Sequence, residues 1–252
     1  MEQPYQMIKL RPRLKVITEM LPKCNLVCDI GADHAYLPIY LLKNSICKRA
    51  IVTEISQGPL NTAICNIKKR HLENDIEVIL GDGLKALTDS KFLHDNRDED
   101  YVVIIAGMGG KLIERILMDG IHQAKKANAL ILQPMSGIEI ISEWLIKEGF
   151  EIYDGRLVKD DNRIYNVLAV KWTSVQKSYK PIDLYISKKL VEKKDPLLEQ
   201  YINWKISILN KVILNLKNSK DDKDNRKDNK GNLFKLEAFR NEMINILELL
   251  QR

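Results

Sequence analysis

The sequence lacks the long apolar run that a membrane-spanning helix requires. No stretch of its 252 residues approaches ~18 consecutive apolar residues without a charge, so we expect no membrane partner. The opening segment, MEQPYQMIKLRPRLK, has no apolar run followed by small residues and predicts no secretory signal. With 45% hydrophobic and 29% charged residues, the composition excludes a disordered or collagen-like chain, and we expect a cytoplasmic protein.

Cysteine and histidine are scarce, with four of each in the chain. Cys24 and Cys28 are separated by three residues, but neither a second cysteine pair nor a histidine cluster follows them. We therefore expect reduced cysteines and no bound metal, with a zinc site at Cys24 and Cys28 as the alternative.

The first part of the chain has no excess of either charge. Residues 1–172 hold 23 Lys and Arg against 23 Asp and Glu, whereas residues 173–252 hold 17 against 11. The whole net charge of +6 therefore belongs to the last 80 residues. This asymmetry favours a neutral site-bearing domain followed by a module that meets a polyanion, although lysines that only solvate a helical surface would give the same count.

Residues 1–172 alternate short apolar runs with amphipathic stretches. The apolar runs predict buried strands at 26–30, 50–53, 76–80, 101–106 and 129–132. The amphipathic stretches predict helices at 37–42, 59–70, 111–118 and 138–148. No helix separates 150–158 from 164–171, so these two runs predict an antiparallel pair. The pattern indicates an α/β fold with a doubly wound, mostly parallel, Rossmann-like sheet that has an antiparallel end.

The pattern changes after Pro181. Apolar residues recur at helical spacing in a short stretch near 184–191 and in two long ones, 196–217 and 233–250. The segment between the long helices, 219–232, is polar and turn-rich, and we expect a mobile tip there. We therefore predict a coiled-coil-like hairpin and two domains, 1–172 with a basic N-terminal helix and 173–252. We expect a monomer, with a dimer as the open alternative.

The first predicted strand ends in Asp29-Ile30-Gly31-Ala32-Asp33-His34. Gly31 permits a tight turn, so that a ligand can approach the backbone amides at the start of the next helix. The dinucleotide fingerprint GxGxxG is absent, because His34 and Leu37 stand where it requires glycine. The turn therefore suits a ligand without a pyrophosphate and disfavours NAD.

Three further strand ends carry residues suited to a nucleoside. Glu54 follows the second strand and can accept both ribose hydroxyls, while Asp82 follows the third and can accept an adenine amino hydrogen. Small residues at 106–110, Ala-Gly-Met-Gly-Gly, leave space over the fourth strand. Each feature alone is generic, but open parallel sheets bind ligands at consecutive strand ends. Together they favour S-adenosyl-L-methionine (SAM) as the cofactor.

The ordered motifs DIGADHAYLP (29–38), EISQGP (54–59), GDGL (81–84), IAGMGG (105–110) and LQP (132–134) resemble the bacterial TrmK family. That family consists of tRNA methyltransferases that methylate N1 of adenine 22, with a class I SAM-dependent domain and a coiled-coil C-terminal domain. The resemblance implies tRNA as the partner. It also implies a cofactor pocket formed by Asp29, Gly31, Ala32, His34, Glu54, Ile55, Asp82, Gly83, Ala106, Gly107 and Met108. One departure is Met135, where the family commonly has Asn.

We expect Asp33 to be the catalytic residue. Adenine N1 attacks with a lone pair and needs no prior deprotonation, but the methylated base is cationic, so a carboxylate would stabilise it or accept the N6 proton. Asp33 as a helix cap, or His34 as a packing residue, is the alternative role. The residues expected to contact the RNA are Lys9, Arg11, Arg13, Tyr36, Pro134 and Tyr165.

The alternative interpretation of these residues is structural: the basic ones would form a solvated helix face, and the two tyrosines would pack in the core. Two rival functions remain at this stage: SAM-dependent methylation of a small molecule or protein, and a non-catalytic SAM- or RNA-binding protein.

Overall fold

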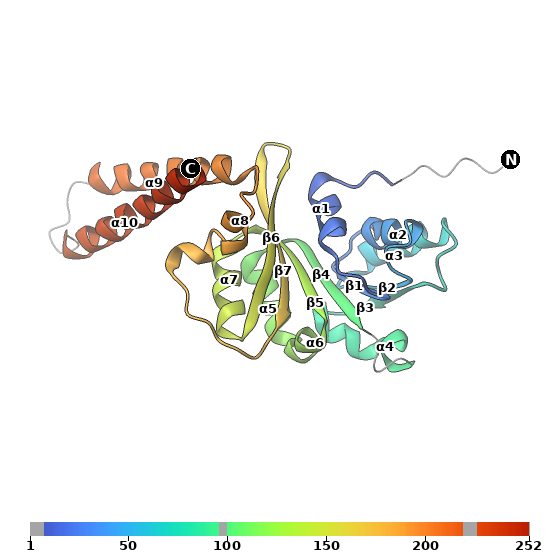
Figure 1. Cartoon of the computed structure of the whole chain (residues 1–252). Coiled ribbons are helices and arrows are strands. Elements are labelled where there is room, and N and C mark those ends of the chain that lie inside the picture. The colour runs from blue at the N-terminus through green and yellow to red at the C-terminus, as the bar shows by residue number, and fades with distance from the viewer. Residues whose placement is uncertain (1–7, 96–99, 219–225, 252) are drawn as a thin grey trace. The chain divides into compact units, whose positions relative to one another are not determined.

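A seven-stranded mixed sheet forms the centre of the first structural unit, Met1–Lys177, in the computed structural model (Figure 1). The structure describes residues 8–95, 100–218 and 226–251. The strands are β1 (Leu26–Ile30), β2 (Arg49–Glu54), β3 (Ile76–Leu80), β4 (Tyr101–Gly109), β5 (Ala129–Ser136), β6 (Phe150–Asp160) and β7 (Arg163–Trp172).

The strand order is β3-β2-β1-β4-β5-β7-β6. The pairings from β3 to β5 are all parallel, and β7 pairs antiparallel with both β5 and β6. The order reverses between β1 and β4, and such a reversal opens a crevice at the carboxyl ends of the two strands. The expected doubly wound sheet with an antiparallel end is confirmed.

Helices cover both faces of this sheet, which explains why its central strands are mostly apolar and buried. One face packs against α1 (Pro12–Met20), α2 (Tyr36–Lys43) and α3 (Gln57–Lys68). Alternate residues face the other side, where α5 (Gly110–Asp119), α6 (Ile121–Lys126) and α7 (Ile138–Lys147) contact the strands. Two short elements that the sequence did not predict, η1 (Gly83–Asp89) and α4 (Lys91–Asp95), follow β3.

Strand β4 runs three residues beyond its predicted end at Ala106. Its register against β5 shifts on both sides of Met108, and Gly107 has a φ of 78°, which glycine adopts without strain. Gly110 then packs directly against the backbone of Gly137, leaving no room for a side chain. The irregular strand end therefore brings the backbone of 106–110 to the crevice.

The second unit, Ser178–Arg252, is helical. It comprises η2 (Pro181–Leu184), α8 (Lys188–Glu192), α9 (Leu198–Asn218) and α10 (Arg226–Leu250). The two long helices pack antiparallel: Lys217 pairs with Glu237 at 2.7 Å, and Arg240 lies 3.4 Å from Asn210 Oδ1. Ile213 and Met243 are buried along the helices. The predicted helical hairpin is confirmed.

Several boundaries differ from the predicted ones. The division follows Lys177 rather than Trp172, because Thr173, Gln176 and Lys177 bond to Gly149, Lys147 and Glu151 in the first unit. Residues 219–225 of the predicted mobile tip lie outside the described residues, and α10 already begins at Arg226. The basic N-terminal helix starts at Pro12, whose fixed φ suits a first helical position, so Lys9 and Arg11 precede it.

Within the described ranges, no helix combines the length and apolar character needed to cross a membrane. No group of three His, Cys, Asp or Glu side chains is placed to hold a metal ion in the same ranges. The four cysteines are free thiols.

Candidate active site

A cleft of about 550 Å³ opens at the carboxyl ends of β1 and β4, where the strand order reverses. Ligand pockets of ~300–1,000 Å³ are typical of small-molecule sites. Nine of its lining residues come from the loop after β1, the start of α2 and the end of β4. A further set comes from the segment that leads into α1: Lys9, Leu10, Arg11, Arg13 and Leu14.

The loop after β1 has an unusual backbone. Gly31, Asp33 and Ala35 have φ values of 69°, 54° and 56°, and only glycine adopts this region without strain. Three hydrogen bonds hold the loop: Gly31 N–H donates to Thr53 C=O, Asp33 N–H donates to Glu54 Oε1, and Asn66 Nδ2 donates to His34 C=O. The end of β2 and helix α3 therefore fix the backbone of this loop.

Two glycines leave space in the cleft. A Cβ at Gly31 would collide with the Met108 methyl group, so the absent side chain lets β4 approach the turn. At Gly107 no atom lies within 4 Å of the Cβ position. The backbone at Gly107 can therefore approach a ligand closely, whereas Met108 fills the space beside Gly31.

Two buried carboxylates lie beneath the loop. Burial, followed by repulsion from Glu54, raises the pKa of Asp29 to about 7. Burial also raises the pKa of Glu54, which is 7% exposed, and the hydrogen bond from Asp33 N–H opposes that rise. That bond is accepted by Oε1 of Glu54.

Asp33 presents its carboxylate to solvent at the cleft, with its side chain 68% exposed. Its Oδ2 lies 3.4 Å from His34 Nε2, and the His34 ring centroid lies 5.4 Å from that of Tyr36. The alternative role of Asp33 as a helix cap is wrong, because Ala35 is the N-cap of α2 and no side chain bonds there. His34 Nδ1 is buried and has no hydrogen-bond partner among the described residues.

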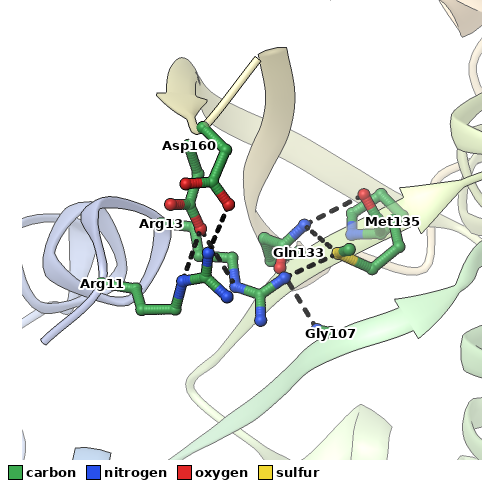
Figure 2. Close-up of polar contacts among 8 residues, drawn as sticks. Arg11, Arg13, Gly107, Gln133, Met135 and Asp160 are labelled. Atoms are coloured by element: carbon green, nitrogen blue, oxygen red, sulfur yellow. Dashed lines mark hydrogen bonds and ion pairs between the residues drawn. The ribbon is translucent and has the colours of Figure 1, made fainter. Parts of the chain in front are cut away.

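Charged side chains form the wall contributed by α1 (Figure 2). Arg11 Nε and Arg13 Nε lie 3.4 and 3.5 Å from the same oxygen of Asp160, which is 5% exposed at the end of β6. Arg13 Nη1 donates to Met135 Sδ at 2.9 Å. The neighbouring side chain of Gln133 accepts the Gly107 N–H at 3.2 Å and donates to the Pro134 carbonyl at 3.1 Å.

The cleft brings together most of the residues predicted for the cofactor: Asp29, Gly31, Ala32, His34, Ala106, Gly107 and Met108, with Asp33 beside them. Lys9, Arg11, Arg13 and Tyr36, which were predicted to contact RNA, line the same cleft. Glu54 borders it through its hydrogen bond to Asp33.

The remaining predicted residues do not line this cleft. Ile55 and Asp82 are exposed, and Gly83 packs against Ile116 beside η1. Pro134 is buried, and Tyr165 packs against the core cluster on the α1 face of the sheet.

Sequence reasoning missed Gln133, Thr53 and Asp160. Gln133 is fully buried between β4 and β5, and the LQP motif was its only signal. Thr53 Oγ1 is buried without a partner among the described residues, directly before Glu54. Asp160 lies in a polar hairpin turn that has no motif.

These features fit SAM. No atom lies within 4 Å of the Cβ position at Gly107, which admits a ligand against the backbone, while His34 Nδ1 and Thr53 Oγ1 are buried polar atoms without partners in the described structure. The doubly wound sheet with this glycine-lined crevice at the reversal of its strand order defines a class I SAM-dependent methyltransferase.

Comparison with known proteins gives the family. Residues 27–237 match the model of TrmK, tRNA (adenine(22)-N(1))-methyltransferase. The chain therefore belongs to the TrmK family. It is 36% identical over 177 residues to the Bacillus subtilis tRNA (adenine(22)-N(1))-methyltransferase, covering 70% of this chain and 71% of that protein.

Solved structures agree with this assignment. The structure of the B. subtilis M1A22 tRNA methyltransferase TrmK superposes with a TM-score of 0.80 at 28% identity, covering 94% of this chain and 98% of that one. Streptococcus pneumoniae Sp1610 in complex with SAM superposes with a TM-score of 0.77 at 26% identity, covering 93% and 98%.

Proposed function

We propose that this protein transfers a methyl group from SAM to N1 of adenine 22 in tRNA. The observation that carries the proposal is the family match over residues 27–237, which covers the strand ends that form the crevice and reaches into the helical unit. SAM supplies the methyl group in electrophilic form, on a sulfonium. We further propose that the protein acts as a monomer in the cytoplasm.

The residues at the four strand ends would hold the cofactor. Gly31 would let Met108 of β4 pack against the turn, Gly107 would admit the cofactor against the backbone, and Glu54 Oε2 would accept the ribose hydroxyls, because Oε1 already bonds to Asp33 N–H. Asp82 and Ile55 would border the adenine, since both are exposed beside β3 and β2. The other cofactor-binding residues in this proposal are Asp29, Ala32, His34, Gly83, Ala106 and Met108.

Asp33 would act on the adenine. Its exposed carboxylate lies at the mouth of the cleft, where it would stabilise the positive charge that develops on the base or accept the N6 proton. His34, 3.4 Å from Asp33 Oδ2, would orient that carboxylate. Holding the reacting atoms in line would contribute most of the acceleration, and positioning alone supplies up to ~7–11 kcal/mol.

The RNA would meet basic groups on both structural units. Lys9, Arg11 and Tyr36 line the cleft, and the helical unit, residues 178–252, carries exposed lysines on α9 and α10. Because N1 lies on the pairing edge, the adenine must be unstacked, at a cost of a few kcal/mol that phosphate contacts elsewhere would offset. Pro134 and Tyr165 would contribute to RNA binding only by supporting the cleft, because neither lines it.

The test is a methylation assay with purified protein, SAM and a tRNA transcript, followed by mass spectrometry of the digested RNA. We expect one N1-methyladenosine per tRNA and none in a matched transcript with guanosine at position 22. Methylation of the guanosine-22 transcript at another site would overturn the target. SAM binding without any methylated tRNA would overturn the activity and favour a non-catalytic binder or another acceptor.

A further inference from the structure

The guanidinium of Arg13 has more hydrogen-bond donors than there are strong acceptors around it. Its side chain is 20% exposed, and its Nε is buried with no hydrogen-bond partner among the described residues. Nη1 donates to Met135 Sδ, and a thioether is a weak acceptor (Figure 2). A guanidinium with five donors thus lies at the cleft with one weak hydrogen bond and one ion pair at 3.5 Å. A ligand that carries oxygen acceptors can accept hydrogen bonds from the remaining donors of such a group.

The sheet order places Arg13 away from the nucleoside half of the proposed cofactor. Glu54 and Asp82 follow β2 and β3, on one side of β1. Arg13 contacts Met135 at the end of β5 and Asp160 at the end of β6, on the opposite side of β4. The cleft lies between these sides, so Arg13 faces it from the side open to a second substrate.

We propose that Arg13 binds a backbone phosphate next to the target adenosine and thereby holds the unstacked nucleotide in the cleft. The proposal rests on the proposed function, because it requires an RNA substrate. The planar fork of arginine matches two oxygens of one phosphate, which a lysine cannot match.

The charge of the product decides between the phosphate and the base as the partner. Methylation at N1 places a positive charge on the adenine, so a guanidinium against its pairing edge would raise the barrier. The same guanidinium on a phosphate neutralises a group that is anionic throughout the reaction. Arg13 therefore contributes to binding and positioning, and Asp33 acts on the base.

The neighbours of Arg13 have separate roles in this account. Asp160 is nearly buried and shared with Arg11, so it holds the guanidinium in place without saturating its donors. Met135 Sδ is an acceptor that a phosphate oxygen displaces at little cost.

The first experiment measures steady-state kinetics with full-length protein, SAM and tRNA transcript. Arg13→Ala should raise KM for tRNA by about tenfold or more and leave SAM affinity within about twofold, as expected when a charge-assisted pair is removed. Arg13→Lys, which keeps the charge and protects folding, should raise KM by about threefold. Arg156→Ala is the matched control: Arg156 also pairs with α1, at 3.1 Å from Glu19, but lies outside the cleft lining. Unchanged KM in both folded Arg13 variants would overturn the proposal.

The second experiment identifies the phosphate. A ligated tRNA with a neutral methylphosphonate on either side of adenosine 22 should raise KM at one position for the unaltered protein. The same substitution should have no further effect on Arg13→Ala, because that variant no longer forms the pair. Additive losses at both positions would show that Arg13 contacts no flanking phosphate.

Met135→Leu distinguishes a binding role from a structural one. Leucine keeps the volume and removes the sulfur acceptor, so KM should stay within about twofold if the sulfur only occupies the phosphate position. A KM as high as that of Arg13→Ala would mean that Arg13 acts by bracing β5. If the unaltered protein methylates no tRNA, the proposed function fails, whereas methylation that is insensitive to Arg13 overturns this inference alone.

Discussion

The two walls of the cleft are built in different ways. The cofactor wall, formed by Asp29, Gly31, Gly107 and Met108 with Glu54 behind them, consists mainly of backbone and buried carboxylate at the ends of β1, β2 and β4. The arginine wall, formed by Arg11 and Arg13 with Met135 and Asp160 behind them, consists of long charged side chains. A rigid backbone surface fits one ligand shape, whereas long side chains can exchange one hydrogen-bond partner for another.

The charged groups of the two walls are also in different environments. On the cofactor wall, burial raises the pKa of both Asp29 and Glu54. Burial therefore destabilises the two charged carboxylates, and hydrogen bonds from a bound ligand can offset that destabilisation. On the arginine wall, each guanidinium already has a carboxylate nearby. We propose that the first wall is organised for one small cofactor and the second for an anionic polymer.

The largest expected effect is at Asp33, which lies between the two walls. Asp33→Asn should lower kcat by about a hundredfold while SAM and tRNA binding change little, because only the charge that stabilises the cationic base is removed. Asparagine is preferred here over alanine because it tolerates the φ of 54°. Rapid-quench turnover and SAM calorimetry measure the two effects. Loss of SAM affinity instead would place Asp33 on the cofactor wall.

A smaller effect is expected at Gly31. Gly31→Ala should weaken SAM binding by about tenfold, because its φ of 69° and the Met108 methyl group both oppose a side chain. Gly58→Ala is the matched control, since nothing lies within 4 Å of its Cβ position in α3. Calorimetry with SAM measures both variants, and equal affinities would show that the turn does not carry the cofactor.

The pKa of Asp29 predicts a pH dependence of stability. In the free protein Asp29 titrates at about 7, whereas an unfolded Asp titrates at ~3.9, so the folded state holds an extra proton between these values. Stability from this group therefore falls as pH rises through that window. Between pH 5 and pH 8, the free energy of unfolding should therefore fall by about 2 kcal/mol more for the unaltered protein than for Asp29→Asn. Parallel unfolding curves for both proteins would contradict the raised pKa.

The smallest effect concerns the helical unit. Replacing the exposed Lys211 on α9 and Lys235 on α10 by glutamine should weaken tRNA binding by about threefold at low salt. The slope of the logarithm of the binding constant against the logarithm of the salt concentration should also become shallower, by up to ~0.9 for each phosphate that the protein no longer neutralises. The charge-preserving Lys211→Arg, Lys235→Arg protein is the control. Equal slopes for all three proteins would mean that these helices do not contact the RNA.

The cofactor wall was largely predictable from sequence because its signals are local. A buried strand followed by a glycine, an acid or both identifies each strand end, and the ends of parallel strands must meet at one sheet edge. Local patterns did not reveal the shifted register at Met108, which lets β4 continue beyond Ala106. They also missed η1 and α4, which are too short to show a periodic pattern.

The arginine wall was not predictable as a site. Arg13, Met135 and Asp160 come from three distant segments, and only the fold brings them together. Lys9, Arg11 and Arg13, which were predicted to contact RNA, line the cleft, and their RNA contact stays a prediction. Tyr165 shows the limit of this reasoning, because a strand tyrosine packs against the core as readily as it lines a site.

The account is tested most directly by a crossed titration of methylation rate against SAM and tRNA for Glu54→Ala and Arg13→Ala. Each variant alters one wall, so saturating SAM should restore the rate of Glu54→Ala, and saturating tRNA should restore that of Arg13→Ala. Neither should be restored by the other substrate. Rescue of both variants by the same substrate would contradict the division of the cleft into a cofactor wall and an RNA-binding wall.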